Sequence, residues 1–169
     1  MAVYTYGVTS VKYGTAATGA GNFPSGVLLT TLPNTVKGSV TLEESVATQA
    51  KFYVDQQANP IRVAQTEVSE MSAKMQFYDL TFATIAALKG GTGNVSGYAP
   101  ATGFSQINLA LEILTDSGHR IQFYNAYIEA HLTGGGGRDK QFALEMNAIP
   151  QMTTDNSASW RIHQYGPLG

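Results

Sequence analysis

The chain has 169 residues, a length that suits one domain with a hydrophobic core of its own. Only 13% of the residues are charged and the formal net charge is −2, whereas soluble domains usually contain about 25% charged residues. The absence of cysteine excludes disulfides, thiolate nucleophiles and cysteine-ligated zinc. The sequence contains no cluster of basic residues of the kind that indicates specific nucleic-acid binding. The sparse charge fits a neutral β protein, and it also fits a subunit that is covered by its neighbours.

The chain starts with a segment that predicts a strand followed by a loop. The first residues, MAVYTYGVTSVKYG, lack the basic start and apolar stretch of a signal peptide, so we expect none. Tyr4, Tyr6 and Val8 alternate with small polar residues, which predicts a first strand. Residues 14–26 are rich in glycine and alanine and indicate an arm-like loop. No apolar run is long enough to span a bilayer, so we expect no membrane insertion by this chain.

The next segment predicts a half-buried strand and a long polar connection. In TVKGSVTLEES, which begins at Thr35, the apolar residues Val36, Val40 and Leu42 alternate with polar ones. Residues 45–60 are mostly polar, and only residues 51–54 have strand character. This second arm-like segment is expected to be either an ordered surface loop or a projecting hairpin.

Residues 61–65 lead into a long alternating strand, EVSEMSAKMQFY. Its apolar face is expected to carry Met71, Ala73, Met75 and Phe77, and its polar face Glu70, Ser72, Lys74 and Gln76.

A short helix is predicted directly after this strand, over residues 80–89. Either Asp79 or Thr81 can cap its N-terminus, and Gly90 or Gly91 can end it. Its buried stripe is expected to contain Phe82, Ile85, Ala86 and Leu88. One short helix cannot form a core, so it has to cover one side or end of a sheet.

The second half of the chain predicts a loop over residues 93–103 and then a meander of antiparallel strands. The first strand carries Ile107, Leu109, Leu111 and Ile113 on one face, and residues 116–119 form a hairpin turn. The returning strand, over residues 120–132, changes phase near residues 123–125, which predicts a β-bulge. A further strand, ended by Pro150, places Phe142, Leu144, Met146 and Ala148 inward, and residues 159–165 form the last strand.

Together these elements predict a mainly β fold of a single domain. Two antiparallel sheets are expected to pack as a sandwich or barrel with one short flanking α-helix.

The residues that usually carry catalysis are not arranged for it. His119, His131 and His163 do not have the spacing of metal ligands. Glu43 and Glu44 are adjacent, so in a strand they point to opposite faces. The chain lacks the G-x-S-x-G motif of a nucleophile elbow. We therefore expect a protein that is not an enzyme and that needs no cofactor and no metal.

The order of the segments resembles a known family. The strand TVKGSVTLEES, the polar connection, the strand ending in EVSEMSAKMQFYD, the helix TFATIAALKGGTG and the following meander are similar to the major tail tube proteins of long-tailed bacteriophages. The resemblance is greatest to those of phages and related contractile injection systems of Bacteroidetes-type hosts. It covers residues 35–150, and its most specific part lies at residues 76–92.

This resemblance implies a virion structural protein that acts by self-assembly. Subunits of such a protein form rings, usually hexameric, which stack into a hollow tail tube through which DNA is ejected or an effector protein passes. The expected partners are other copies of the chain, and sheath, tape-measure and baseplate or terminator proteins. The expected location is the virion tail, assembled in the cytoplasm of the host bacterium.

The resemblance also assigns two sets of site residues. The candidate contacts between rings are Lys51, Phe52, Tyr53, Val54 and Asp55. The candidate lumen-facing residues are Glu70, Ser72, Lys74 and Gln76.

A binding module is the alternative. In that case a monomeric β-sandwich would bind carbohydrate by stacking sugars on Tyr98, Tyr124, Tyr127 and Trp160. Such aromatic residues are more often found in cores and interfaces.

Overall fold

The computed structural model describes residues 7–53, 60, 62–65, 69–103, 105–134 and 142–164. These residues contain one α-helix, α1 (Phe82–Lys89), and one short 3-10 helix, η1 (Gly26–Leu28). The strands are β1 (Val8–Thr15), β2 (Thr30–Leu32), β3 (Thr41–Glu44), β4 (Gln49–Phe52), β5 (Arg62–Gln65), β6 (Met71–Tyr78), β7 (Thr92–Asn94), β8 (Gly97–Ala99), β9 (Ile107–Thr115), β10 (His119–Thr133), β11 (Ala143–Gln151) and β12 (Trp160–Gln164).

One large antiparallel sheet forms the body of the molecule. Its strand order is β2-β1-β9-β10-β11-β6-β3, and β12 also pairs with β10. Residues 119–123 of β10 pair with β12, whereas residues 125–133 pair with β11. Between these two parts, the register with β9 shifts between Phe123 and Ala126, which confirms the predicted bulge. Because a bulge bends a strand, β10 passes from one half of the sheet to the other.

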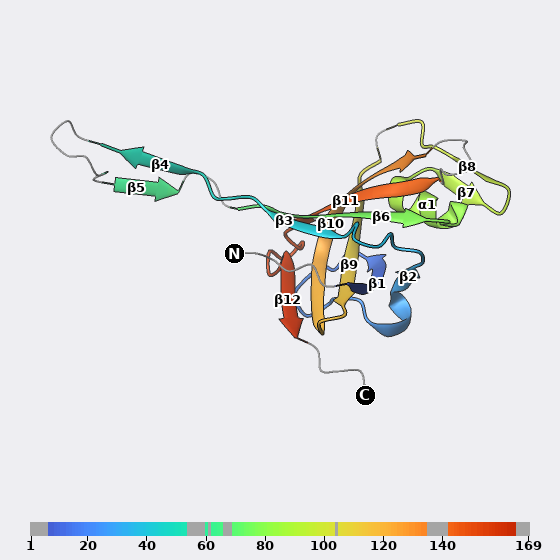
Figure 1. Ribbon diagram of the computed structural model, residues 1–169, viewed down its shortest axis with the longest axis horizontal. Helices are drawn as coiled ribbons and strands as arrows, with labels where there is room; N and C mark the ends of the chain where they lie inside the picture. Colours follow the sequence, from blue (N-terminus) through green and yellow to red (C-terminus); the bar gives the residue numbers. More distant parts are fainter. Residues whose placement is uncertain are drawn as a thin grey trace.

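The bend produces two half-sheets that face each other. The first half-sheet contains β2, β1, β9, the first part of β10 and β12; the second contains the last part of β10, β11, β6 and β3. In Figure 1 the strands of the first run across those of the second. This arrangement confirms the mainly β, sandwich-like prediction, with the difference that both sheets share β10.

The hydrophobic core lies between the half-sheets. Its buried side chains include Val11, Leu111, Ile113, Ile121 and Phe123 from the first, and Ala73, Met75, Phe77, Leu144 and Met146 from the second. The side chains of β6 and β9 that the alternation predicts to point inward therefore do contribute to the core. Phe142 is an exception, because its side chain is 72% exposed and precedes β11.

Helix α1 begins after a capping threonine and ends at a glycine. The Thr81 hydroxyl accepts a hydrogen bond from the Thr84 backbone N–H at 3.2 Å, so the N-cap is Thr81 and not Asp79. Gly90 ends the helix with a φ of 84°. Ile85 and Leu88 are buried as predicted, but Phe82 is 42% exposed. The buried stripe is therefore narrower than the sequence pattern predicts.

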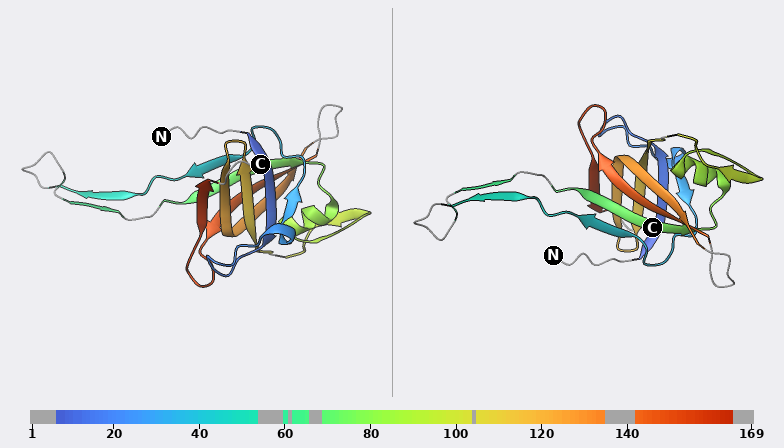
Figure 2. Two further views of the ribbon diagram at one scale, coloured as in Figure 1. Left: turned by 90° about the horizontal axis from the view of Figure 1, so that it is seen from below. Right: turned by 90° about the horizontal axis from the view of Figure 1, so that it is seen from above.

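The polar connection before β6 is a projecting hairpin. Strands β4 and β5 form a two-stranded antiparallel sheet of their own, in which Phe52 lies opposite Arg62. Figures 1 and 2 show this hairpin extending far from the body. It is called the arm here, defined by β4 and β5. Residues 62–65 therefore belong to the separate sheet of the arm, and the described part of the strand predicted over EVSEMSAKMQFY begins only at Met71.

The other expected arm, residues 14–26, does not project. Gly14 and Thr15 belong to β1, and the following loop returns to the body. The Ala17 backbone N–H donates to the Tyr124 carbonyl at 2.7 Å, and the Phe23 ring lies edge-on to Tyr124 at 5.3 Å between centroids. These contacts bury the Tyr124 side chain, so the loop is part of the domain.

Two further segments differ from their predicted structure. The strand expected from Thr35 is interrupted, because Gly38 has a φ of 76° and regular pairing with β6 resumes only at Thr41. The loop expected over residues 93–103 contains the hairpin β7–β8. Tyr4 and Tyr6 lie outside the described residues.

Candidate self-assembly surfaces

The outer face of the second half-sheet is polar. On β3, β6, β10 and β11, every second side chain points away from the core. Most of these side chains are polar or charged, and the face also carries the pair Tyr127 and Ile149, which lie opposite each other in the register. The polar and charged members are Thr41, Glu43, Ser72, Lys74, Gln76, Glu129, His131, Thr133, Glu145 and Asn147. They are called the polar face. In the strand register, Asn147 lies between Lys74 and Glu129, so the members form cross-strand rows.

Weak ion pairs connect neighbouring strands on the polar face. Lys74 Nζ lies 2.8 Å from Glu43 Oε2, and His131 Nε2 lies 2.9 Å from Glu145 Oε2. Gln76 Nε2 donates to the other oxygen of Glu145 at 3.4 Å. Exposed pairs of this kind contribute about 1 kcal/mol or less. The polar face is therefore a hydrated surface and adds little to the stability of the fold.

The polar face carries more negative than positive charge. Its carboxylates belong to Glu43, Glu129 and Glu145, while Lys74 is its lysine. Phosphate groups near such a surface would be repelled.

The candidate lumen-facing residues mostly share this face. Ser72, Lys74 and Gln76 alternate along β6 with the buried Ala73 and Met75. Glu70 precedes the strand and is exposed. The structure therefore places Ser72, Lys74 and Gln76 on one surface, as the alternation predicts.

The outer face of the first half-sheet is built differently. Glu112 and Gln122 lie side by side in the register and are only 5% and 4% exposed. The Glu112 carboxylate is 3.9 Å from Lys12 Nζ and 3.5 Å from Arg120 Nε, and it accepts a hydrogen bond from Gln122 Nε2 at 3.1 Å. Arg161 donates to Gln122 Oε1 at 2.9 Å. This network ties β1, β9, β10 and β12 together.

The arm exposes large apolar side chains. Phe52 is 50% exposed, Tyr53 58% and Val63 50%. The guanidinium of Arg62 lies over the Phe52 ring at 6.0 Å from its centroid. Of the candidate contacts between rings, Lys51, Phe52 and Tyr53 thus lie on the arm. Val54 and Asp55 are outside the described residues.

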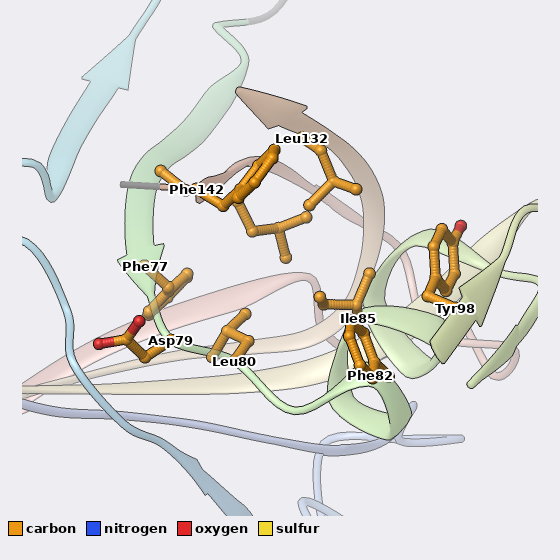
Figure 3. A pocket seen from close by; sticks show the side chains of 10 residues that line it. Phe77, Asp79, Leu80, Phe82, Ile85, Tyr98, Leu132 and Phe142 are labelled. Carbon is orange, nitrogen blue, oxygen red and sulfur yellow. The ribbon is translucent and has the colours of Figure 1, made fainter. Parts of the chain in front are cut away.

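An apolar pocket lies at the end of β6, next to α1 (Figure 3). It has a volume of about 450 Å³. Its lining consists of Phe77, Asp79, Leu80, Phe82, Ile85, Tyr98, Leu132, Phe142, Ala143 and Leu144. Side chains from α1, β6, β8, β10 and β11 meet there. Sequence reasoning missed the pocket, because the periodic pattern assigned Phe82 and Phe142 to the core, whereas they are 42% and 72% exposed.

The aromatic residues of the alternative carbohydrate site do not form one platform. Tyr124 is only 2% exposed and cannot stack on a sugar. Tyr98 Oη donates to the Gly90 carbonyl at 2.8 Å beside α1, whereas Trp160 lies on β12.

The three histidines have different surroundings, and although His119 and His163 lie on the paired strands β10 and β12, the register places their side chains on opposite faces. His119 Nδ1 bonds with Ser117 Oγ at 2.8 Å, His131 pairs with Glu145, and His163 lies opposite Arg120 in the register. Burial, followed by the charges of Arg161 and Arg120, lowers the pKa of His163. Across the described ranges, no three His, Cys, Asp or Glu side chains could jointly hold a metal ion.

Within the part of the chain that the structure describes, no helix is long and apolar enough to cross a membrane. Among known proteins, no family model matches this chain, and no curated protein matches it. A functional proposal therefore rests on the surfaces of the molecule and on the resemblance seen in the sequence.

Proposed function

We propose that this protein is the structural subunit of a hollow tail tube, which assembles from stacked hexameric rings and through which DNA or an effector protein passes. The arm is the observation that carries this proposal. A two-stranded hairpin is only marginally stable in water by itself. The arm nevertheless extends from the body with Phe52, Tyr53 and Val63 exposed. Such a hairpin gains stability when another molecule covers it.

The size of that gain favours a multi-copy assembly. Covering the exposed parts of these three side chains is worth on the order of 1 kcal/mol each. A single contact of this strength is weak, because association costs translational and rotational freedom. Repetition of the same contact around a ring and along a stack makes the assembly stable.

The second half-sheet supports the proposal as the lining of the tube. Its inner face belongs to the core and its outer face is polar, as an aqueous channel requires. The excess of carboxylates from Glu43, Glu129 and Glu145 would keep DNA phosphates from adhering. Joining β3 to a neighbouring subunit would also protect an exposed sheet edge.

Electron microscopy tests this proposal directly. Purified protein is concentrated, negatively stained and compared with the same sample in dilute solution, while analytical ultracentrifugation measures the mass of the particles. We expect rings or tubes with a central channel. A protein that sediments as a monomer at every concentration would contradict the proposal.

A further inference from the structure

We propose that the apolar pocket beside α1 receives the exposed aromatic side chains of the arm from a second copy of this chain. The inference rests on the proposed function, because the second copy is the next subunit along the tube. It adds the acceptor surface, which the sequence did not reveal.

The positions of arm and pocket in the molecule favour this contact. Strand β6 starts on the side of the arm with Met71 and ends at Tyr78, immediately before the pocket residues Asp79 and Leu80. Figure 1, drawn with the longest axis horizontal, shows the arm at one end and α1 with β7 and β8 at the other. An arm at one end cannot reach the pocket at the opposite end of its own chain. A second copy can, and such a head-to-tail contact repeats from copy to copy.

The chemistry of the two surfaces is complementary. The arm offers Phe52, which is 50% exposed. The pocket offers about 450 Å³ of mostly apolar space. Its rim includes Leu132, 42% exposed, and Phe142, 72% exposed, which would also be covered by an inserted side chain.

The charges on the arm and beside the pocket also favour this contact. Asp79 is the acidic residue of the pocket lining, and its carboxylate lies at the edge of the cavity in Figure 3. Arg62 lies directly opposite Phe52 in the arm, with its guanidinium 6.0 Å from the ring centroid. Insertion of Phe52 therefore brings Arg62 toward Asp79. The occupant of the pocket is thus expected to carry an aromatic side chain next to a cation, as the arm does.

The absence of native cysteine allows a direct test by cross-linking. The double variant Phe52→Cys with Phe142→Cys carries one donor and one acceptor on every copy. The two substitutions also remove the aromatic side chains of the contact, so the variant is oxidised mildly at concentrations well above those at which the wild type assembles. We then expect a ladder of dimers, trimers and longer species on a non-reducing gel. An equimolar mixture of the two single variants should stop at dimers.

A matched control uses an equally accessible position away from the pocket. Val27 on η1 is fully exposed, so Phe52→Cys with Val27→Cys has the same number of reactive thiols. This pair should give no ladder. A ladder of equal yield from the control, or none from Phe52 with Phe142, would overturn the inference.

A second measurement does not depend on disulfide geometry. Phe52→Ala and Phe142→Ala each remove one side of the contact at an exposed position, so the circular dichroism spectrum and Tm should stay the same. Each is expected to shorten the tubes or raise the concentration needed to form them by about tenfold. The double variant should be little worse than either single variant, since both remove the same contact.

The outcomes separate this inference from the proposed function. If tubes form normally from both alanine variants, another occupant fills the pocket and the inference fails while the tube proposal stands. If the cysteine pair gives ladders but microscopy shows only linear chains without a channel, the contact is real and the tube proposal fails. If the wild-type protein stays monomeric and gives no ladder, both are wrong.

Discussion

Glu112 illustrates how a sparsely charged chain uses its charges. The residue is only 5% exposed, yet Lys12, Arg120 and Gln122 contact its carboxylate from two neighbouring strands. A buried carboxylate would be costly without such partners. The alternation in β9 predicts that Glu112 points away from the core, but not that its neighbours enclose it. Enclosure depends on strand pairing, which brings together residues far apart in the chain.

A charge introduced into the core should unfold the domain. Leu111 and Met75 are 0% and 2% exposed and lie in the two opposing half-sheets. Leu111→Asp or Met75→Asp would bury an unpaired carboxylate and leave a cavity, which together exceed about 5 kcal/mol. Since a domain of this kind is stable by about 5–15 kcal/mol, the variants should be largely unfolded. Circular dichroism and urea titration measure the result.

The conservative variant Met75→Leu serves as the control for this prediction. It retains an apolar side chain of similar volume and should cost less than about 1.5 kcal/mol. A soluble Met75→Asp protein with the melting temperature of the wild type would show that this face of β6 does not face the core.

Asp155 makes one contribution to stability depend on pH. Its carboxylate accepts hydrogen bonds from Thr153 Oγ1 at 2.7 Å and from the Ser157 backbone N–H at 2.9 Å. The Ser157 side chain, followed by Thr153, lowers the pKa of Asp155 below its usual 3.8. Folding therefore favours the ionised form. The stabilisation is complete above pH 3.8 and is lost as the pH falls through the lower pKa of the folded state.

The variant Asp155→Asn measures this contribution. It keeps an acceptor oxygen but cannot ionise, so it should be less stable than the wild type at pH 7. The difference in free energy of unfolding should shrink when urea titrations are repeated at pH 3. An equal difference at both pH values would contradict the assignment.

Several of these single-residue features could be predicted because their causes are local. Thr81 caps α1 and Gly118 has a φ of 78° in the turn before β10, and both choices follow from the residue type. Phe82 and Phe142 were expected in the core and are exposed. An apolar position in a periodic pattern shows which way a side chain points, not whether another element covers it.

At the scale of elements, long strands were predictable and short ones were not. The hairpin of β9 and β10 and its bulge follow from alternation over many residues. The strands β7 and β8 have three residues each, too few for a period to emerge. Their turn did carry a signal, because the Asn94 side chain accepts hydrogen bonds from the backbone N–H groups of Ser96 and Gly97.

The arm should be dispensable for folding and necessary for stacking. A deletion of residues 47–57 alone would remove β4 and leave β5 without its partner. Replacing residues 47–68 by an Asn-Gly turn removes the arm completely. The turn can close there because the Ser45 backbone N–H donates to the Glu70 carbonyl at 2.8 Å.

We expect this arm-excised protein to be monomeric or to form single rings, with unchanged cooperativity of thermal unfolding. Shortening a connection between two strands does not weaken the core, and none of the described residues of the arm belongs to the core. Sedimentation and electron microscopy measure the assembly, and calorimetry measures the fold. Loss of the folded monomer would show that the arm is part of the domain, while tubes of normal length would show that stacking does not need it.

At the scale of the whole molecule, the two outer faces differ in charge. The polar face of the second half-sheet is rich in carboxylates. On the first half-sheet, Lys12 and Arg120 pair with Glu112, and Arg161 donates to the neighbouring Gln122. Composition reports only the small net charge of −2. The separation arises from the bend in β10, which turns the two faces in different directions. A subunit with two unlike faces is suited to a closed ring, in which one face points inward and the other outward.

If the polar face lines the lumen, assembly should restrict access to it by size. Lys74 is 54% exposed, so the variant Lys74→Cys should react in the arm-excised monomer with both N-ethylmaleimide and a maleimide attached to a long polyethylene glycol. In tubes, N-ethylmaleimide can diffuse along the channel, whereas the long polymer loses conformational entropy on entering it. We therefore expect Lys74→Cys in tubes to react with the small reagent and only slowly with the large one, as measured by mass spectrometry and gel shift. Val27→Cys, on the first half-sheet side at η1, should show a smaller difference between the reagents. Equal rates for the large reagent at Lys74 in tubes and in monomers would place the polar face outside the channel.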